Sequence, residues 1–165
     1  MNELQVGISV MTSKERSIWN GEIHGVNWEI QRFPHFREQS NRKYAWTFYL
    51  SLDLGRFPQE SNPDAWWLPP RFDDKGREHY DYYGTPVSDI DWHGGITWYS
   101  KESSPDSKSR FIKAGCDYMH YGDLEDCDYS LDEIKMDVLE AIRSFRSLVP
   151  GYKFRCRWDG EFHAP

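Results

Sequence analysis

Hydrophobic and polar residues alternate most clearly along Tyr44–Leu54. Every second position in this stretch carries a large apolar side chain: Trp46, Phe48, Leu50, Leu52 and Leu54. Side chains of a β-strand point alternately to the two faces of a sheet, so the pattern predicts a strand with one buried face. Three further segments are also apolar enough for strands, with a polar turn between the last two. These strands are Leu4–Met11, Gly94–Tyr99 and Arg110–Tyr121, and the turn is Lys101–Ser109.

A hairpin is predicted over Ile18–Phe33. Val26, Trp28 and Ile30 follow a period of two and would share one face. The segment holds two glycine-containing pieces, Asn20-Gly21 and His24-Gly25, and the Asn-Gly pair is the dipeptide that tolerates positive φ in a tight turn.

A helix is predicted to begin after Ser130. Ser130 and Glu133 form a capping-box pattern, in which each side chain satisfies a backbone N–H group of the first turn. An apolar stripe at helical spacing follows: Leu131, Ile134, Val138, Ala141, Ile142, Phe145 and Leu148. Pro150-Gly151 ends the helix, and a last strand is predicted at Tyr152–Trp158.

Several strands followed by one helix predict the α+β class. We expect a single domain over residues 1–165, with a mainly antiparallel sheet and the C-terminal amphipathic helix packed on one face. A long loop rich in aromatic residues is expected at about residues 55–90. Aromatic residues make up 16% of the chain, which favours a packed core over disorder.

Composition narrows the function classes. The sequence has no apolar run long enough to cross a membrane and no recognisable secretion signal, and its three cysteines form no even disulfide framework. These features predict a reduced, cytoplasmic setting. The net charge is −7, which argues against direct binding to nucleic acid. No phosphate loop or dinucleotide fingerprint is present, and no cofactor is predicted.

The net negative charge of the chain is concentrated in Asp117–Glu140. This segment holds nine acidic side chains and one basic side chain, Lys135, for a local charge of about −8. The segment is interpreted in one of two ways. It is a solvated helix face, or it is an anionic surface that meets a basic partner protein such as a nucleic-acid-binding complex. The residues expected to contact such a partner are Asp117, Asp123, Glu125, Asp126, Asp128, Asp132 and Asp137.

The aromatic loop is a second candidate contact surface. Trp66, Trp67 and Tyr82 belong to residue types that are enriched at binding hot spots. The alternative is that these rings fasten the loop onto the sheet. The sequence alone does not separate the two interpretations.

The motif Asp91-Trp92-His93-Gly94-Gly95 carries the clearest chemical possibility. His93 would act as a general base, with Asp89 or Asp91 orienting it and glycine N–H groups facing an oxyanion. The simpler interpretation is a turn whose glycines supply positive φ. No metal site is predicted, although zinc held by His93, Cys116, His120 and Cys127 is a weaker alternative whose spacing matches no standard pair.

Cys116 and His120 complete the enzyme hypothesis. On a strand they share a face but lie about 13 Å apart, at roughly 3.3 Å per residue, so neither a shared metal nor a Cys–His pair forms unless the backbone bends. The enzyme alternative is a small His/Cys-dependent hydrolase or metal-binding enzyme centred on residues 89–120, with His93, Asp91, Cys116 and His120 as its catalytic residues.

Two motifs together resemble a known group of proteins. Trp92-His93-Gly94-Gly95-Ile96-Thr97-Trp98-Tyr99 and Gly115-Cys116-Asp117-Tyr118-Met119-His120 resemble small uncharacterised proteins of bacteriophages and mobile elements, over about residues 80–160. The resemblance implies a bacterial cytoplasm and a role at the phage–host interface. It fits an inhibitor of a host defence complex.

Overall fold

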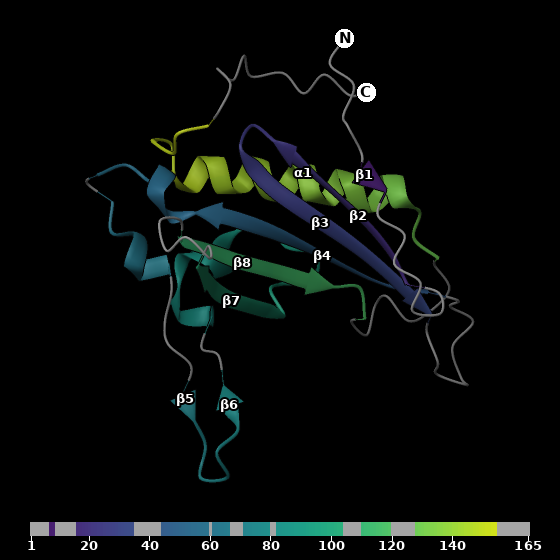
Figure 1. Cartoon of the computed structure of the whole chain (residues 1–165), viewed down its shortest axis with the longest axis horizontal. Coiled ribbons are helices and arrows are strands. Elements are labelled where there is room, and N and C mark those ends of the chain that lie inside the picture. Colours follow the sequence, from purple (N-terminus) through teal and green to yellow (C-terminus); the bar gives the residue numbers. More distant parts are fainter. Residues whose placement is uncertain are drawn as a thin grey trace.

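The computed structural model describes residues 7–8, 16–34, 44–59, 61–66, 71–79, 82–103, 110–119 and 128–154. In these residues a six-stranded antiparallel sheet carries the helix α1 (Leu131–Leu148) on one face (Figure 1), which confirms the expected α+β architecture. The strand order is β1-β2-β3-β4-β8-β7. The strands are β1 (Gly7–Ile8), β2 (Ser17–Ile23), β3 (Val26–Pro34), β4 (Tyr44–Asp53), β7 (Trp98–Ser103) and β8 (Arg110–Asp117).

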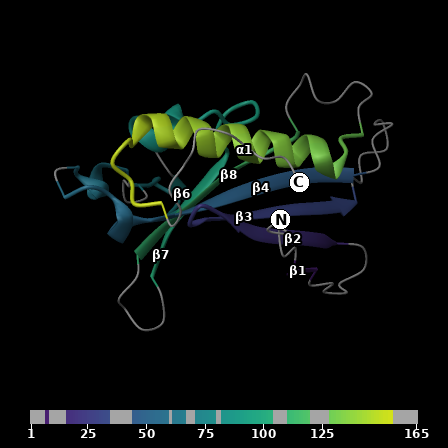
Figure 2. The ribbon, with the colours of Figure 1, turned by 90° about the horizontal axis from the view of Figure 1, so that it is seen from above.

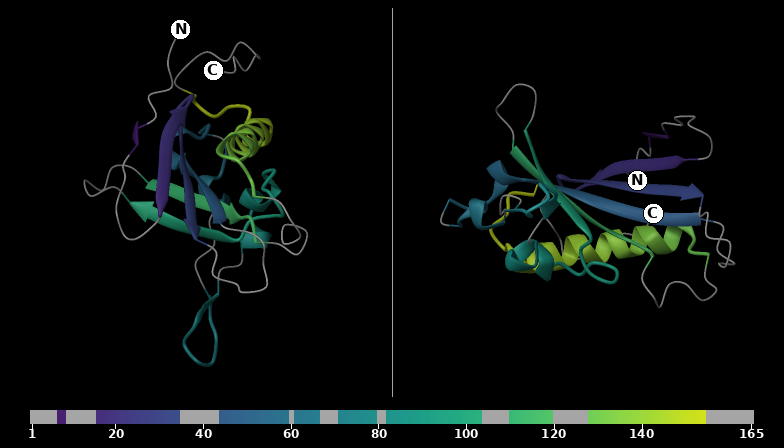
Figure 3. Two further views of the ribbon diagram at one scale, coloured as in Figure 1. Left: turned by 90° about the vertical axis from the view of Figure 1, so that its right-hand side faces the viewer. Right: turned by 90° about the horizontal axis from the view of Figure 1, so that it is seen from below.

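The sheet is strongly twisted, and α1 lies along its concave side (Figures 2 and 3). The helix packs mainly on β3 and β4. No helix among the described residues is long and apolar enough to cross a membrane.

The predicted hairpin is formed by β2 and β3, but its turn is at His24-Gly25. Both turn residues have positive φ, 52° and 92°, as the two central residues of a type I′ turn require. Gly21 lies inside β2 instead, opposite Trp28. A Cβ atom at Gly21 would come within 2.8 Å of the Trp28 ring. This glycine therefore makes room for an indole and does not form the turn.

The predicted central strand is confirmed as β4. Its alternate residues Trp46, Phe48, Leu50 and Leu52 are buried beneath α1, as expected from the period of two. β3 and β8 pair with the two edges of β4, so the most apolar strand lies in the middle of the sheet.

The strands β7 and β8 differ from their predicted bounds. β7 begins at Trp98 because Trp92–Gly95 forms a turn, closed by a hydrogen bond from Gly95 N–H to the Trp92 carbonyl. It continues to Ser103, into the segment expected to be a turn. β8 ends at Asp117, earlier than predicted.

The helix prediction is confirmed. α1 begins after Ser130, and its capping box with Glu133 is complete. The residues that face the sheet are Ile134, Val138, Ala141, Ile142 and Phe145, all buried. The prediction of a strand at Tyr152–Trp158 is wrong for its first residues, because Tyr152–Phe154 is not in a strand. Tyr152 instead packs edge-to-face on Phe57 and Phe145.

The long aromatic loop contains short elements of its own. They are the 3₁₀ helices η1 (Leu54–Arg56), η2 (Pro63–Trp66), η3 (Tyr82–Gly84) and η4 (Pro86–Asp89), and the strands β5 (Arg71–Phe72) and β6 (Glu78–His79). Strands β5 and β6 pair with each other as a separate two-stranded sheet.

Candidate functional site

Exposed carboxylates gather at the first turn of α1. Asp128 and Glu133 are exposed, and the Asp132 side chain is 92% exposed. We call Asp128, Asp132 and Glu133 the acidic start of α1. The N-terminal end of a helix carries partial positive charge from its unpaired N–H groups, which stabilises carboxylates there. Two of the three carboxylates, those of Asp132 and Glu133, lie on the first turn of the helix, and Asp128 lies two residues before the cap.

The capping box fixes the position of this acidic turn. The Ser130 N–H group donates to Glu133 Oε2 at 2.7 Å, and the Glu133 N–H group donates to Ser130 Oγ at 3.3 Å. The backbone hydrogen bond from Ser130 is the main cause that lowers the pKa of the Glu133 carboxyl below its usual value. Glu133 is therefore ionised and ordered at neutral pH.

The rest of α1 is less acidic than the segment suggested. Glu140 pairs with Arg143 at 2.6 Å. Within the acidic start itself, Asp132 lies 3.7 Å from Lys135. Asp137 accepts a hydrogen bond from the Tyr118 hydroxyl. The anionic surface is therefore concentrated at the start of the helix and does not extend along its whole polar side.

Asp117 lies at the end of β8, in the same half of the molecule as the start of α1 (Figure 1). It is half-buried, and its Oδ1 accepts a hydrogen bond from the Met119 N–H group at 3.0 Å. Asp123, Glu125 and Asp126 lie outside the described residues, so their expected contacts stay predictions.

His93 lies in the turn between η4 and β7. The turn places Gly94 at φ 64° and Gly95 at φ 100°, a conformation that favours glycine. Because the Gly95 N–H group bonds the Trp92 carbonyl at 3.2 Å, it serves the turn and does not face an oxyanion. The simpler interpretation of the two glycines is therefore the one that fits.

Three side chains meet around His93. The imidazole stacks on Tyr118 with ring centroids 4.0 Å apart, and Tyr129 packs edge-on against both rings. Asp137, on α1, brings its Oδ2 to 3.7 Å from His93 Nδ1 and accepts a 2.6 Å hydrogen bond from the Tyr118 hydroxyl. We call His93, Tyr118, Tyr129 and Asp137 the His93 cluster.

The Tyr118 hydroxyl is a permanent donor in this cluster. Burial is the main cause that raises its pKa far above the usual value, and the hydrogen bond to Asp137 adds to the effect. Its proton consequently stays on the phenol at every physiological pH. The Asp137 carboxylate is then held in place, with its negative charge beside the imidazole.

The cluster differs from the predicted catalytic set. Asp137 takes the place beside His93 that was expected of Asp89 or Asp91, while the Asp91 N–H group donates to Ser144 on α1 at 3.0 Å. The Cys116 thiol is 1% exposed within the core, so it is corrected from a nucleophile to a small buried apolar group. His120 and Cys127 lie outside the described residues, as does any contact they make.

The described side chains do not support a zinc site at His93. Among the described residues no group of three or more His, Cys, Asp or Glu side chains is arranged to hold a metal ion.

The aromatic loop is partly core and partly surface. Trp66 is 6% exposed and packs edge-to-face on Phe57 and Phe145, so it is corrected from a contact residue to a core residue. Phe72 and Tyr83 are instead strongly exposed. Trp67 lies outside the described residues. Tyr82 begins η3, but its side chain is not among those described.

Sequence reasoning missed Tyr118, Tyr129 and Phe72. Tyr118 carried a signal, because it is two residues from Cys116 and would share a face with it on a strand, although β8 ends at Asp117. Phe72 carried none, since a single phenylalanine in a polar loop is equally consistent with burial.

The chain matches no protein-family model, no curated protein and no solved structure.

Proposed function

We propose that the protein is a non-enzymatic interaction module that presents the acidic start of α1 to a positively charged partner protein. The observation that carries the proposal is the exposure of Asp132 and Glu133 on a helix turn fixed by a capping box, together with that of Asp128 two residues before the cap. Ordered carboxylates bind cations without the entropic cost of ordering a loop first.

The partner class that fits is a basic nucleic-acid-binding complex in the bacterial cytoplasm. Such a partner has a positively charged groove for phosphates, and a compact anionic surface competes for that groove. The resemblance to small phage proteins supports the same assignment, an inhibitor that blocks a host complex without itself binding nucleic acid or a membrane.

A pull-down from a bacterial lysate tests this proposal. The tagged full-length chain is used at low and at high salt, and bound proteins are eluted with duplex DNA. The double variant Asp128→Asn/Asp132→Asn removes two charges from the acidic start. The control Asp89→Asn/Asp91→Asn removes two charges from exposed positions, of which Asp91 is bonded to Ser144 through its N–H group. Ser144 lies about 18 Å along the helix from Asp132, at 1.5 Å per residue.

The expected result is a DNA-eluted protein that the wild type and the control capture at low salt and the first variant does not. Equal capture by all three proteins would contradict the proposal, as would capture that high salt leaves unchanged, because surface charge interactions are screened by salt.

The His93 cluster favours a second candidate, a His93-dependent hydrolase. A carboxylate facing Nδ1 orients an imidazole for proton transfer, and the described cluster supplies that orientation through Asp137. Model esters and phosphodiesters would be hydrolysed by the wild type and not by His93→Gln. If both proteins show the same background rate, this second candidate is wrong.

A further inference from the structure

Arg32 carries a positive charge on the face of the sheet that α1 covers. It lies near the end of β3, directly opposite Ser17 on β2 and Trp46 on β4. Trp46 is buried beneath α1, so Arg32 shares its face of the sheet. The Arg32 side chain is half-buried. A guanidinium, which stays charged at every physiological pH, is therefore held at the border of the apolar core.

Three aromatic rings surround this guanidinium. Arg32 Cζ lies 4.4 Å from the ring centroid of Tyr44, 5.4 Å from that of Trp19 and 5.6 Å from that of Trp46. The two indoles also stack on each other at 5.7 Å. Ring faces attract a cation, but they offer its N–H groups no oxygen or nitrogen acceptor. The rings therefore fix the guanidinium without using its hydrogen-bonding capacity.

The described residues satisfy little of that capacity. A guanidinium has five N–H donors. Arg32 Nη2 donates to Ser17 Oγ at 3.2 Å, whereas Nε is buried and has no acceptor within the described part of the chain. A charge that is partly withdrawn from water and not paired is costly, so an oxyanion brought to this guanidinium would be strongly favoured.

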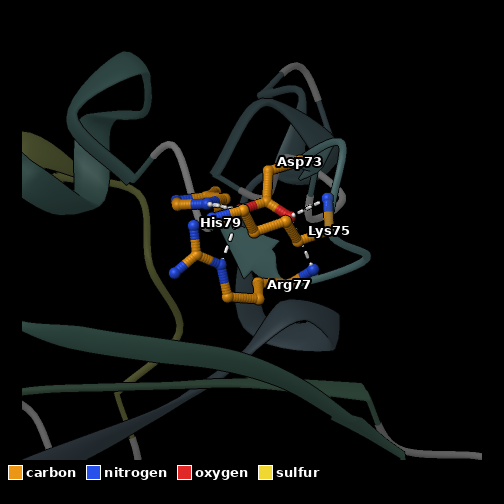
Figure 4. A network of polar contacts seen from close by, with 4 residues as sticks. All are labelled: Asp73, Lys75, Arg77 and His79. Carbon is orange, nitrogen blue, oxygen red and sulfur yellow. Dashed lines mark hydrogen bonds and ion pairs between the residues drawn. The ribbon is translucent and has the colours of Figure 1, made fainter.

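Other arginines of the chain are paired with carboxylates. Arg77 Nε donates to Asp73 Oδ2 at 2.7 Å, and the Arg77 N–H group donates to Asp73 Oδ1 at 2.8 Å (Figure 4). Three further arginines lie 3.4, 3.8 and 2.6 Å from carboxylate oxygens: Arg56, Arg110 and Arg143. Arg32 forms no such pair with the described carboxylates. Since its surroundings are less polar than those of the exposed Arg77 side chain, an ion pair would be stronger there.

We propose that Arg32 is the anion-binding group of a ligand site formed by β2, β3 and β4. The ligand is a small organic oxyanion, whose carboxylate or phosphate oxygens accept hydrogen bonds from the terminal nitrogens of the guanidinium. Trp19 and Tyr44 are only half-buried, so an apolar group next to the oxyanion would contact their rings. This site goes beyond the acidic start of α1, which attracts the opposite charge.

A nuclear magnetic resonance titration of the full-length, ¹⁵N-labelled chain tests the proposal. The signal of the Arg32 Nε–H group is assigned through bonds along the side chain and is followed as a probe is added. Benzoate and phenyl phosphate distinguish a carboxylate ligand from a phosphate ligand. Acetate and inorganic phosphate are the matched probes without a ring, and sodium chloride keeps the ionic strength constant.

The expected result is a saturable shift of the Arg32 signal with benzoate or phenyl phosphate. The Kd should be on the order of 1 mM for ligands of this size, and about threefold or more weaker for the probe without the ring. Arg32→Lys keeps the charge but loses the planar fork, so the affinity should fall about tenfold. The control Arg143→Lys, at an arginine that pairs with Glu140, should bind as the wild type does.

Three results would overturn the proposal. They are no saturable shift of the Arg32 signal up to about 50 mM of any probe, a shift that sodium chloride alone reproduces, and equal affinity in a folded Arg32→Lys variant. The backbone amide spectrum shows whether that variant is folded. If it is not, the wild-type titration still decides, because its signal comes from Arg32 itself. None of these outcomes depends on the capture of a partner protein.

Discussion

At the scale of single residues, Gly115 explains how the outer face of the sheet is built. A Cβ atom there would lie 2.3 Å from the Phe48 carbonyl oxygen and 2.4 Å from the Tyr49 ring. Tyr49 in turn packs edge-on against Trp98, at 5.4 Å between ring centroids, and Lys113 Nζ lies 5.1 Å from the Tyr49 ring. The glycine allows an aromatic ring to cover the centre of β8.

Gly115→Ala should therefore destabilise the fold by about 1–3 kcal/mol or more, the range for an overpacked site. Urea unfolding measures the loss. Adding Tyr49→Ala should not restore stability, because the Phe48 carbonyl still blocks the new methyl group. Full rescue by the second substitution would show that the ring alone excludes a side chain.

Tyr118→Phe should lower the free energy of unfolding by about 1 kcal/mol, the net value of a buried hydrogen bond. The substitution keeps the stacked ring but removes the hydroxyl that donates to Asp137. The control is Tyr83→Phe, in which the hydroxyl belongs to a strongly exposed side chain and donates to the Ile96 carbonyl at a long 3.5 Å. Equal effects of the two substitutions would contradict the assigned hydrogen bond.

At the scale of elements, the first turn of α1 depends on Ser130. Ser130→Ala removes the acceptor for the Glu133 N–H group and should cost about 1 kcal/mol. Circular dichroism during urea unfolding checks this value. Ser147→Ala is the control, because Ser147 is exposed near the other end of the same helix.

The same turn should make stability depend on pH. Folding lowers the pKa of Glu133 below its ordinary value of 4.5. The ionised Glu133 therefore stabilises the folded state fully above pH 4.5, and this stabilisation is lost as the pH falls through the pKa of the folded state. Glu133→Gln should therefore destabilise the protein at neutral pH and matter less in acid. A destabilisation by Glu133→Gln that grows as the pH falls would contradict the lowered pKa of Glu133.

At the scale of the whole molecule, Trp66 holds the long loop onto the far end of α1. Its ring packs on Phe57 and Phe145 at centroid distances of 5.3 and 5.7 Å. Trp66→Ala should cost about 3–5 kcal/mol, as for other buried aromatic residues. Calorimetry would check the loss against Tyr83→Ala, which removes an exposed ring from the same loop. A small loss of stability for Trp66→Ala would mean that other contacts hold the loop in place.

The elements with a strong local pattern were predictable, and the site was predictable only in part. The alternation along β4 and the capping box at Ser130 are local signals, and both elements formed where expected. The hairpin turn was misplaced because Gly21 looks like a turn residue until its neighbour across the sheet, Trp28, is known. Asp137 was interpreted as a surface charge, because no local pattern shows that the chain leaving β8 brings the Tyr118 hydroxyl to it.

The exposed aromatic residues could not be separated from the buried ones for the same reason. Trp66 and Phe72 lie in one polar loop, yet one is in the core and the other is in water. Only the packing of η2 against α1 decides between them.

The most direct test of the account is the affinity of the captured partner for the chain as a function of salt. At low salt Asp128→Asn/Asp132→Asn should bind about tenfold more weakly than the wild type, and the two affinities should converge as salt screens the charges. Asp89→Asn/Asp91→Asn should follow the wild type throughout. If the acidic-start variant binds as tightly as the wild type at low salt, the acidic start of α1 is not the binding surface.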